Sequence, residues 1–298
     1  MFPDDAHGPE AMAYAWRMVD PERHVARSVI LRDGTPLGMA FHEHVVWDRM
    51  PERYGRVQVW LAPEDWSAVL GPAMDFAEDL ARAEGTETMF TSVREDQAAL
   101  LDLVTARGFV EKRRSRSWEL DLITGRDRLL AEHEATNRHM REIGITLTSW
   151  DQVGAPDKLD RLHALYEESI QDVPTTAPQV MEPLETFREW IEGSPVVRPD
   201  RIWIALRGAE IVGVSMLEYP VSYGNVWTDY TGTARAVRGQ GVARALKHAT
   251  VAQAIGLGIE RVRTNNDAEN APILKLNIEM GYRRIPGWIQ LHRAAGEG

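Results

Sequence analysis

Two segments of the sequence, 173 residues apart, follow the same pattern. Each begins at a glycine, continues through a strand-like run and a helical stretch, and ends in Gly-Phe or Gly-Tyr. In both copies the two glycines are 23 residues apart, at Gly85 and Gly108 and again at Gly258 and Gly281. A hairpin signal, two strand-like runs around a glycine-containing turn, precedes each copy at nearly the same offset. The repeat therefore predicts a tandem of two related α/β domains, which suits a chain of 298 residues.

The second copy is the more complete of the two. Apolar periodicity in it predicts the order β-α-α-β-β-β-α-β-α-β. The expected strands are 145–149, 201–206, 210–219, 225–233, 260–264 and 287–292, and the expected helices centre on 159–170, 184–191, 242–252 and 271–280.

The first copy is shortened at its beginning. Its first strand, 26–31, starts too close to Met1 for an opening strand and two helices, although 11–19 suits one helix. Residues 126–142 are polar and helix-forming, as expected of a linker. We therefore expect a shortened domain, a linker helix and a complete domain, with the bounds 1–123, 124–143 and 144–298.

One glycine-rich segment indicates chemistry. From Val237 to Ala243 the chain reads Val-Arg-Gly-Gln-Gly-Val-Ala and then enters a helix. Glycines let backbone N–H groups converge, and a helix N-terminus adds partial positive charge, so the segment predicts a pyrophosphate site. It lacks the Gly-Lys-Ser/Thr ending of a P-loop and the three-glycine spacing of a dinucleotide fingerprint.

The order of elements around this segment resembles the GNAT superfamily of acyl-CoA N-acyltransferases. The resemblance is specific over 144–293 and weaker over 25–122. It implies an α/β (α+β) tandem GNAT fold with two mixed central sheets flanked by helices. It also implies that an Arg/Gln-x-x-Gly-x-Gly/Ala loop grips the pyrophosphate of acetyl-CoA, the acyl donor. The residues expected in that loop are Arg238, Gly239, Gln240, Gly241, Val242 and Ala243.

A second signature of the family is an asparagine followed eleven and twelve residues later by Gly-Phe or Gly-Tyr. Asn270, Gly281 and Tyr282 fit these spacings. The family usually has a tyrosine seven residues after the asparagine, and Asn277 stands there instead. An amide cannot act as a general acid, although it can hydrogen-bond the sulfur or the pantetheine arm. We therefore count Asn270 and Asn277 among the cofactor-binding candidates.

In the family the strand before the loop bulges away from its neighbour, and its exposed amides hold the pantetheine arm and polarise the thioester carbonyl. By position, that role belongs to Thr231, Gly232 and Thr233. Glycine is unusual inside a strand, so Gly232 suits a bulge or a close approach of the cofactor.

The implied reaction is direct attack of a neutral amine on the thioester, which needs a group to accept the proton of the amine. Asp229 is the only carboxylate on the predicted strand, and strand alternation would put Trp227, Asp229 and Thr231 on one face. Glu218, near the end of the preceding strand, is a second candidate base. A structural role for Asp229 remains the alternative.

With asparagine at the usual tyrosine position, either another tyrosine protonates the departing thiolate or the thiolate leaves with help from solvent. The tyrosines considered are Tyr219, Tyr223 and Tyr230, with Tyr230 taken as the catalytic candidate. With Trp227 they could also line an acceptor pocket, although aromatic residues on central strands usually belong to the core.

The first copy lacks the loop. Asp65, Trp66, Ala68 and Leu70 stand where the second copy has its arginine, two glycines and alanine. An acid and bulky side chains cannot form a phosphate cradle, so we expect the first domain to support the fold and to wall the acceptor cleft.

Composition excludes several classes of function. A net charge of −11 disfavours nucleic acid as a partner and agrees with an amine substrate. The absence of cysteine excludes a cysteinyl acyl-enzyme. No apolar run is long enough to span a membrane, and no signal peptide is visible, so we expect a cytoplasmic monomer or homodimer.

A metal site is not expected. His42 and His44 would share one face of a strand, but the sequence shows no third ligand near them.

Together these observations predict an acetyl-CoA-dependent N-acetyltransferase that acts on the primary amine of a small molecule. A catalytically weak acyl-CoA sensor or scaffold is the non-enzyme alternative. An acetyltransferase for protein N-termini or lysines is the third reading.

Overall fold

The computed structural model describes residues 8–17, 22–61, 66–221 and 224–296. Tyr223 and Asp65, both considered above, lie outside these residues. The helices are α1 (Pro9–Arg17), α2 (Trp66–Ala83), α3 (Ala98–Ala106), α4 (Arg126–Glu142), α5 (Lys158–Ile170), α6 (Leu184–Arg188), α7 (Val242–Gly256) and α8 (Ala271–Met280). The strands are β1 (Arg23–Arg32), β2 (Thr35–Val45), β3 (Tyr54–Leu61), β4 (Thr88–Arg94), β5 (Val110–Asp121), β6 (Ile145–Ser149), β7 (Ile202–Arg207), β8 (Glu210–Glu218), β9 (Val226–Thr233), β10 (Arg261–Asp267) and β11 (Arg283–Ala294).

All these strands form one mixed sheet, in the order β1-β2-β3-β4-β11-β5-β10-β9-β8-β7-β6. The pairs β3–β4 and β9–β10 are parallel, and the remaining neighbours are antiparallel. The mixed, tandem α/β fold is therefore confirmed, but the two expected sheets are joined edge to edge into one.

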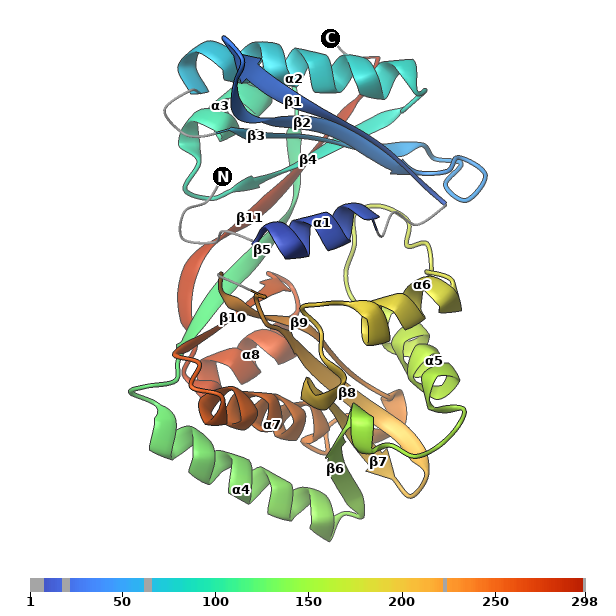
Figure 1. The fold of residues 1–298 in the computed structure, drawn as a ribbon, viewed down its shortest axis with the longest axis vertical. Coiled ribbons are helices and arrows are strands. Elements are labelled where there is room, and N and C mark those ends of the chain that lie inside the picture. The colour runs from blue at the N-terminus through green and yellow to red at the C-terminus, as the bar shows by residue number, and fades with distance from the viewer. Residues whose placement is uncertain (1–7, 18–21, 62–65, 222–223, 297–298) are drawn as a thin grey trace.

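The join results from an exchange of last strands between the halves. β5, the last strand of the first copy, pairs with β10 of the second, and β11 pairs with β4 of the first. β5 and β11 also pair with each other at the centre. In Figure 1 these two long strands run between the halves, and the C-terminus lies beside the N-terminal half.

A buried ion pair holds β11 in the N-terminal half. Arg293 Nη2 donates to Glu78 Oε2 of α2 at 2.5 Å, and Nη1 donates to the backbone oxygen of Arg107 at 2.7 Å. Both charged side chains are only 3% exposed. The pair ties β11 to α2, and loss of either partner would leave the other charge buried without this counter-charge.

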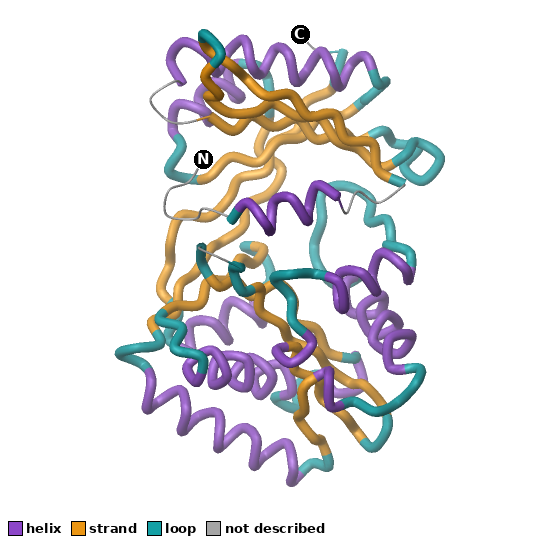
Figure 2. The backbone as a smooth tube through the Cα atoms, viewed as in Figure 1, coloured by secondary structure: helices purple, strands orange, loops and turns teal. Residues whose placement is uncertain are grey.

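Helices cover the sheet on both faces (Figure 2). In the N-terminal half, α2 and α3 pack over β2, β3 and β4. In the C-terminal half, α5 and α6 cover one face, and α4, α7 and α8 cover the other. β9 and the segment after it therefore lie between two helical layers.

The observed elements follow the sequence patterns with shifted ends. The helix expected at 271–280 is α8, and the linker helix expected at 126–142 is α4, each with the expected bounds. β10 and β11 are longer than expected because β10 pairs with β5, and β11 with both β5 and β4, beyond the apolar core of each run.

Candidate acyl-CoA site

The glycine-rich segment forms a tight turn between β9 and α7. Gly239 and Gly241 have φ angles of +76° and +83°, a left-handed conformation that side chains rarely adopt, and Gly241 is the N-cap of α7. A Cβ on Gly239 would meet no atom within 4 Å, so the space above the turn is open. The turn thus presents backbone rather than side chains at the start of a helix of 15 residues.

The arginines of this turn already hold a carboxylate. Arg238 Nη2 donates to Asp172 Oδ2 at 2.6 Å, and Arg235 Nη2 donates to Oδ1 of the same carboxylate at 3.0 Å. Hydrogen bonds from Arg235 and Arg238 lower the pKa of Asp172 to about 2. Two cationic groups therefore converge on one anion beside the glycine turn.

Gln240 braces the turn. Its Nε2 donates to the backbone oxygen of Ala236 at 3.2 Å, and its Oε1 accepts from Arg207 Nη2 at 2.7 Å. Val242 is buried at the start of α7, whereas Ala243 is partly exposed.

β9 separates from β10 just before this turn. Within the described residues, the two strands pair only at Val226 with Val262 and at Trp227 with Arg263. β9 then stays with β8 up to Thr233, while β10 continues along β5. From Thr228 to Thr233 the β10-facing edge of β9 thus lacks a strand partner, and Thr231, Gly232 and Thr233 lie on this open edge.

The bulge of β9 lies at Asp229. Met216 of β8 pairs with Tyr230 and Leu217 with Thr228, which leaves Asp229 as the extra residue. The suggestion that Gly232 marks a bulge is wrong. A Cβ at Gly232 would approach Ser169 Oγ to 2.7 Å and the Tyr230 ring to 2.8 Å, so glycine is required there by close packing.

The bulge also breaks the expected alternation of side chains along β9. Asp229 Oδ2 accepts from Trp190 Nε1 at 3.1 Å, and the Tyr230 ring packs on Tyr166 at 5.1 Å. Tyr166 and Trp190 are themselves in edge-to-face contact at 5.5 Å. Asp229 and Tyr230 therefore reach one aromatic cluster, although they are adjacent in sequence.

The environment of Asp229 disfavours its charge. Burial raises its pKa well above the ordinary aspartate value, and the negative charge of Glu218 raises it further, while the Trp190 hydrogen bond acts in the opposite direction. Glu218 pairs with Trp227 across the β8–β9 ladder. The two candidate bases therefore interact electrostatically, and the charge of Glu218 raises the proton affinity of Asp229.

Tyr230 is held by a hydroxyl contact. Its Oη and Ser169 Oγ are 2.8 Å apart, and Ser169 donates to the backbone oxygen of Leu165. A hydroxyl has a single proton. When Ser169 Oγ donates that proton to the backbone oxygen of Leu165, it must accept from the Tyr230 hydroxyl. Burial raises the pKa of Tyr230, so the phenol keeps its proton at neutral pH.

The two asparagines of the second signature have different surroundings. Asn270 is the N-cap of α8, and its side chain accepts from the Ile273 N–H at 3.5 Å. Asn277 is fully buried, and its Nδ2 donates to Asn266 Oδ1 on β10 at 2.7 Å. Its Oδ1 has no partner among the described residues. In this conformation Asn277 supports β10, so its expected contact with the cofactor stays a prediction.

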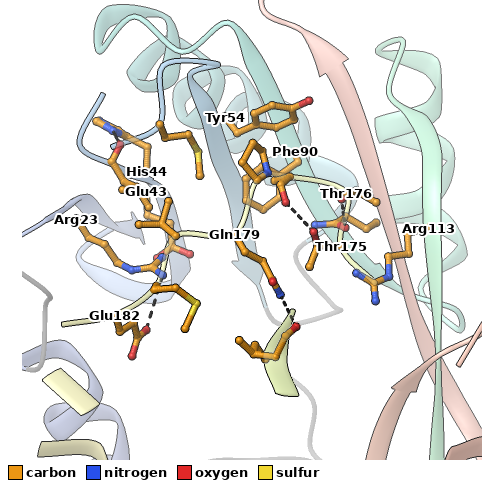
Figure 3. Close-up of a pocket in the computed structure, with 18 of the residues that line it drawn as sticks. Arg23, Glu43, His44, Tyr54, Phe90, Arg113, Thr175, Thr176, Gln179 and Glu182 are labelled. Atoms are coloured by element: carbon orange, nitrogen blue, oxygen red, sulfur yellow. Dashed lines mark hydrogen bonds and ion pairs between the residues drawn. The ribbon is translucent and has the colours of Figure 1, made fainter. Parts of the chain in front are cut away.

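A cavity of about 400 Å³ lies between the two halves (Figure 3). The loop at 175–182, between α5 and α6, forms one wall, and the strands β1 to β4 contribute another. Thr176 Oγ1 donates to Gln290 Oε1 at 2.5 Å, which fixes the loop against β11. Tyr166, a member of the aromatic cluster, lines the same cavity. Tyr230 packs on the Tyr166 ring, but Asp229, Tyr230 and Trp227 are not among the residues that line the cavity.

The charged groups of the cavity are balanced. Arg23 lies beside Glu43 and Glu182 on one side of the cavity, and Arg113 lies on the opposite side (Figure 3). Tyr54 and Phe90 add aromatic surface. Arg113 forms an ion pair with Asp267, and Arg23 lies 4.0 Å from Glu182. The cavity can thus contact both a polar and a flat or apolar part of a small molecule.

The sequence profile of the Acetyltransferase (GNAT) family matches residues 162–282, which include β9, the glycine turn and α8. Those residues are a GNAT domain.

Solved structures extend the similarity to the whole fold. A tandem GNAT protein from the clavulanic acid biosynthesis pathway superposes with a TM-score of 0.72 at 17% identity, over 97% of this chain and 88% of that one. A GCN5-related N-acetyltransferase from Sphaerobacter thermophilus has a TM-score of 0.66 at 16% identity, over 97% and 86%. A glucosamine N-acetyltransferase region of a fungal multi-domain β-N-acetylglucosaminidase has a TM-score of 0.69 at 13% identity, over 98% of this chain and 35% of that one. The chain therefore has a tandem GNAT fold.

A comparison with curated proteins gave no significant match. No helix in the described part of the chain has both the length and the apolar character needed to cross a bilayer.

Sequence reasoning missed several partners in the GNAT domain. Tyr166 and Trp190 fall within the helices expected at 159–170 and 184–191, and their helical spacing gives no sign of a site. Ser169 and Asp172 carry no pattern that links them to β9 or to the glycine turn. Only the packing of α5 and α6 on the sheet brings these four residues to the site.

Proposed function

We propose that the protein transfers an acetyl group from acetyl-CoA to the primary amine of a small molecule by direct transfer. The observation that carries the proposal is the open edge of β9, which leads directly into the glycine turn at the start of α7. In this proposal residues 144–298 form the acetyl-CoA-binding unit, 124–143 the linker, and 1–123 a unit that binds no acyl-CoA.

The residues present fit the cofactor. Left-handed Gly239 leaves open space where a diphosphate can approach backbone N–H groups, and Arg238 supplies a positive charge beside it. The main chain of Thr231–Thr233 offers an unpaired strand edge to the pantetheine arm. When bound, acetyl-CoA supplies the activated acetyl thioester.

Residues of β8 and β9 suit the proton transfers. The amine must lose a proton to attack, and the carboxylate pair of Asp229 and Glu218 can accept it because their coupling raises the proton affinity of Asp229. Tyr230 keeps its proton at neutral pH and can donate it to the departing thiolate. Since the chain has no cysteine, no cysteinyl acyl-enzyme can form.

The cavity between the halves supports a small acceptor. The loop that closes it is held by Thr176 to Gln290 and by Arg49, which donates to the backbone oxygen of Met181 at 3.1 Å. A cavity of about 400 Å³ has room for a compact amine. The glucosamine N-acetyltransferase region that shares this fold is named for an amino sugar, which agrees with this class of acceptor.

A catalytically weak acyl-CoA sensor is the second candidate function. The observation that favours it is Asn277, which stands where the family usually has tyrosine and is fully buried. In that case acetyl-CoA binds, but no amine accelerates the release of CoA.

The test combines binding and turnover. Gly241→Trp adds a bulky side chain at a left-handed position of the turn, and Gly258→Trp is the matched control, because Gly258 has a φ of +78° after the other end of α7. We expect isothermal titration calorimetry to show at least a tenfold weaker affinity for acetyl-CoA in Gly241→Trp only. Equal affinities in both variants would overturn the cofactor assignment.

Turnover is measured as thiol release from acetyl-CoA across amine classes. A catalytic protein gives release that depends on one class of amine, and its initial-rate plots intersect as expected for a ternary complex. Tight acetyl-CoA binding without amine-dependent release would instead support the sensor.

A further inference from the structure

Three side chains with metal-ligating atoms meet in the N-terminal half. His24 of β1 and His44 of β2 lie directly opposite each other in the antiparallel ladder, so both side chains are on one face of the sheet. Glu84 follows the end of α2, which packs on β2. One ligand atom from each residue can be chosen so that all three lie within 4.8 Å of one another.

The hydrogen bonding of His44 leaves one ring nitrogen ready for a ligand. His44 Nδ1 lies 2.8 Å from the backbone oxygen of Val45. A carbonyl oxygen only accepts, so the ring proton is on Nδ1 and Nε2 carries a lone pair. His44 is 8% exposed, and its Nε2 has no hydrogen-bond partner in the described residues.

A neighbouring histidine shows how such a lone pair is otherwise satisfied. His42 Nδ1 also lies against a backbone oxygen, that of Arg56, at 3.0 Å. Its Nε2 is 3.3 Å from the hydroxyl of Thr86, which can donate to it. The ring nitrogen of His42 is thus satisfied within the chain, whereas that of His44 is not.

The hydrogen bonding of His44 is typical of a histidine that binds a metal ion. Histidine ligands almost always donate their other ring N–H to a carbonyl or carboxylate, as His44 does to Val45. The His44 ring is also fixed by stacking on Trp47, with ring centroids 3.7 Å apart. Trp47 Nε1 in turn donates to the backbone oxygen of Glu84 at 2.9 Å, which links that residue to the same cluster.

We propose that His24 Nε2, His44 Nε2 and the Glu84 carboxylate bind one zinc ion, with water completing a tetrahedral site. Tetrahedral zinc with bonds of about 2.1 Å places its ligand atoms roughly 3.4 Å apart. His24 Nε2 and Glu84 Oε1 are already 3.6 Å apart. Both of these side chains are more than two-fifths exposed, so they can rotate toward the fixed His44 ring.

The site goes beyond the proposed acyl transfer and does not depend on it. It would tie β1, β2 and the end of α2 together. His44 also lines the cavity between the halves, so the ion would fix one part of the cavity wall.

The experiment uses tag-free protein of full length. Co²⁺ is titrated as a spectroscopic probe of tetrahedral coordination, followed by competition with Zn²⁺. We expect one Co²⁺ per chain, a visible absorption band, and displacement of the band by Zn²⁺. His24→Ala and Glu84→Gln are each expected to weaken binding at least tenfold. Their far-ultraviolet circular dichroism should remain that of the wild type, because both residues are well exposed.

His139→Ala is the matched control. His139 and Glu142 form another exposed histidine–carboxylate pair, with Nδ1 and Oε2 3.9 Å apart, but the described residues place no third metal ligand beside them. Zinc should raise the melting temperature of the wild type. The His139→Ala variant should bind zinc with the same affinity and show the same rise. No saturable binding below about 100 µM metal would overturn the proposal. Undiminished binding in both His24→Ala and Glu84→Gln would also overturn it.

Discussion

Asp229→Asn tests both the electrostatics and the chemistry of β9. The asparagine side chain has nearly the same shape, and its Oδ1 can still accept from Trp190, as the aspartate does at 3.1 Å. The substitution removes only the ability to ionise. Because burial and Glu218 both raise the pKa of Asp229, the variant should relieve a cost that the wild type bears whenever the carboxylate is charged.

The sign of the stability effect follows from proton binding. Between the unfolded pKa, about 4, and the raised folded pKa, the folded chain holds a proton that the unfolded chain has lost. Over that window the stability of the wild type falls relative to the variant by about 1.4 kcal/mol per pH unit, and the difference is constant at higher pH. Urea denaturation between about pH 5 and pH 9 measures it, since the other titrating groups cancel in the comparison.

Asp229→Asn should lower the activity of the protein although it raises its stability. If Asp229 accepts the proton of the amine, kcat/KM of the wild type rises with pH through the raised pKa. Asp229→Asn should lose this limb and about 10²–10⁴-fold of the rate. Glu218→Gln is the control, because removing the neighbouring charge lowers the pKa of Asp229 and moves the limb to lower pH. Parallel stability curves for wild type and Asp229→Asn would refute the electrostatic reasoning, and an unchanged pH–rate profile would refute the role as base.

Two further predictions concern the strand exchange and the glycine turn. Arg293→Ala should lower the free energy of unfolding, measured in urea, by about 3–5 kcal/mol because it removes the buried partner of Glu78. Arg261→Ala is the control: Arg261 pairs with Glu119 and its side chain is 62% exposed, so its loss should lower the free energy of unfolding by less than about 1 kcal/mol. Similar losses in the two variants would contradict the importance of the buried pair. Asp172→Asn should tighten acetyl-CoA binding about two- to fivefold at low salt, because the carboxylate no longer competes with phosphate for Arg238. Calorimetry that shows weaker binding would mean that Asp172 instead orients the arginine.

Much of the local structure could be predicted because local rules decide it. Closely spaced glycines before a helix predict a tight turn with left-handed backbone, and Gly239 and Gly241 adopt that conformation. Apolar periodicity placed α7 and α8, and the equal spacing of the repeated glycines predicted a tandem α/β fold. These features depend on neighbours within a few residues of each other.

The bulge at Asp229 could not be located in this way. Which residue of β9 is extra depends on its register with β8, and that register is a property of the paired strands rather than of the sequence of β9 alone. The same reasoning applies to Gly232, whose lack of a side chain is explained by Ser169 and Tyr230 rather than by the course of the strand.

By itself, then, the sequence determined the repeat, the glycine turn and the absence of thiol chemistry, because each is a property of residue type and short-range order. The tertiary structure alone decided which strands pair at the centre, where β5 and β11 change places and Arg293 meets Glu78. It also decided that His24, His44 and Glu84 meet, and that a loop of one half closes a cavity against the other. Such contacts join residues tens to hundreds of positions apart, and their free energy comes from burial and charge pairing that no local pattern encodes.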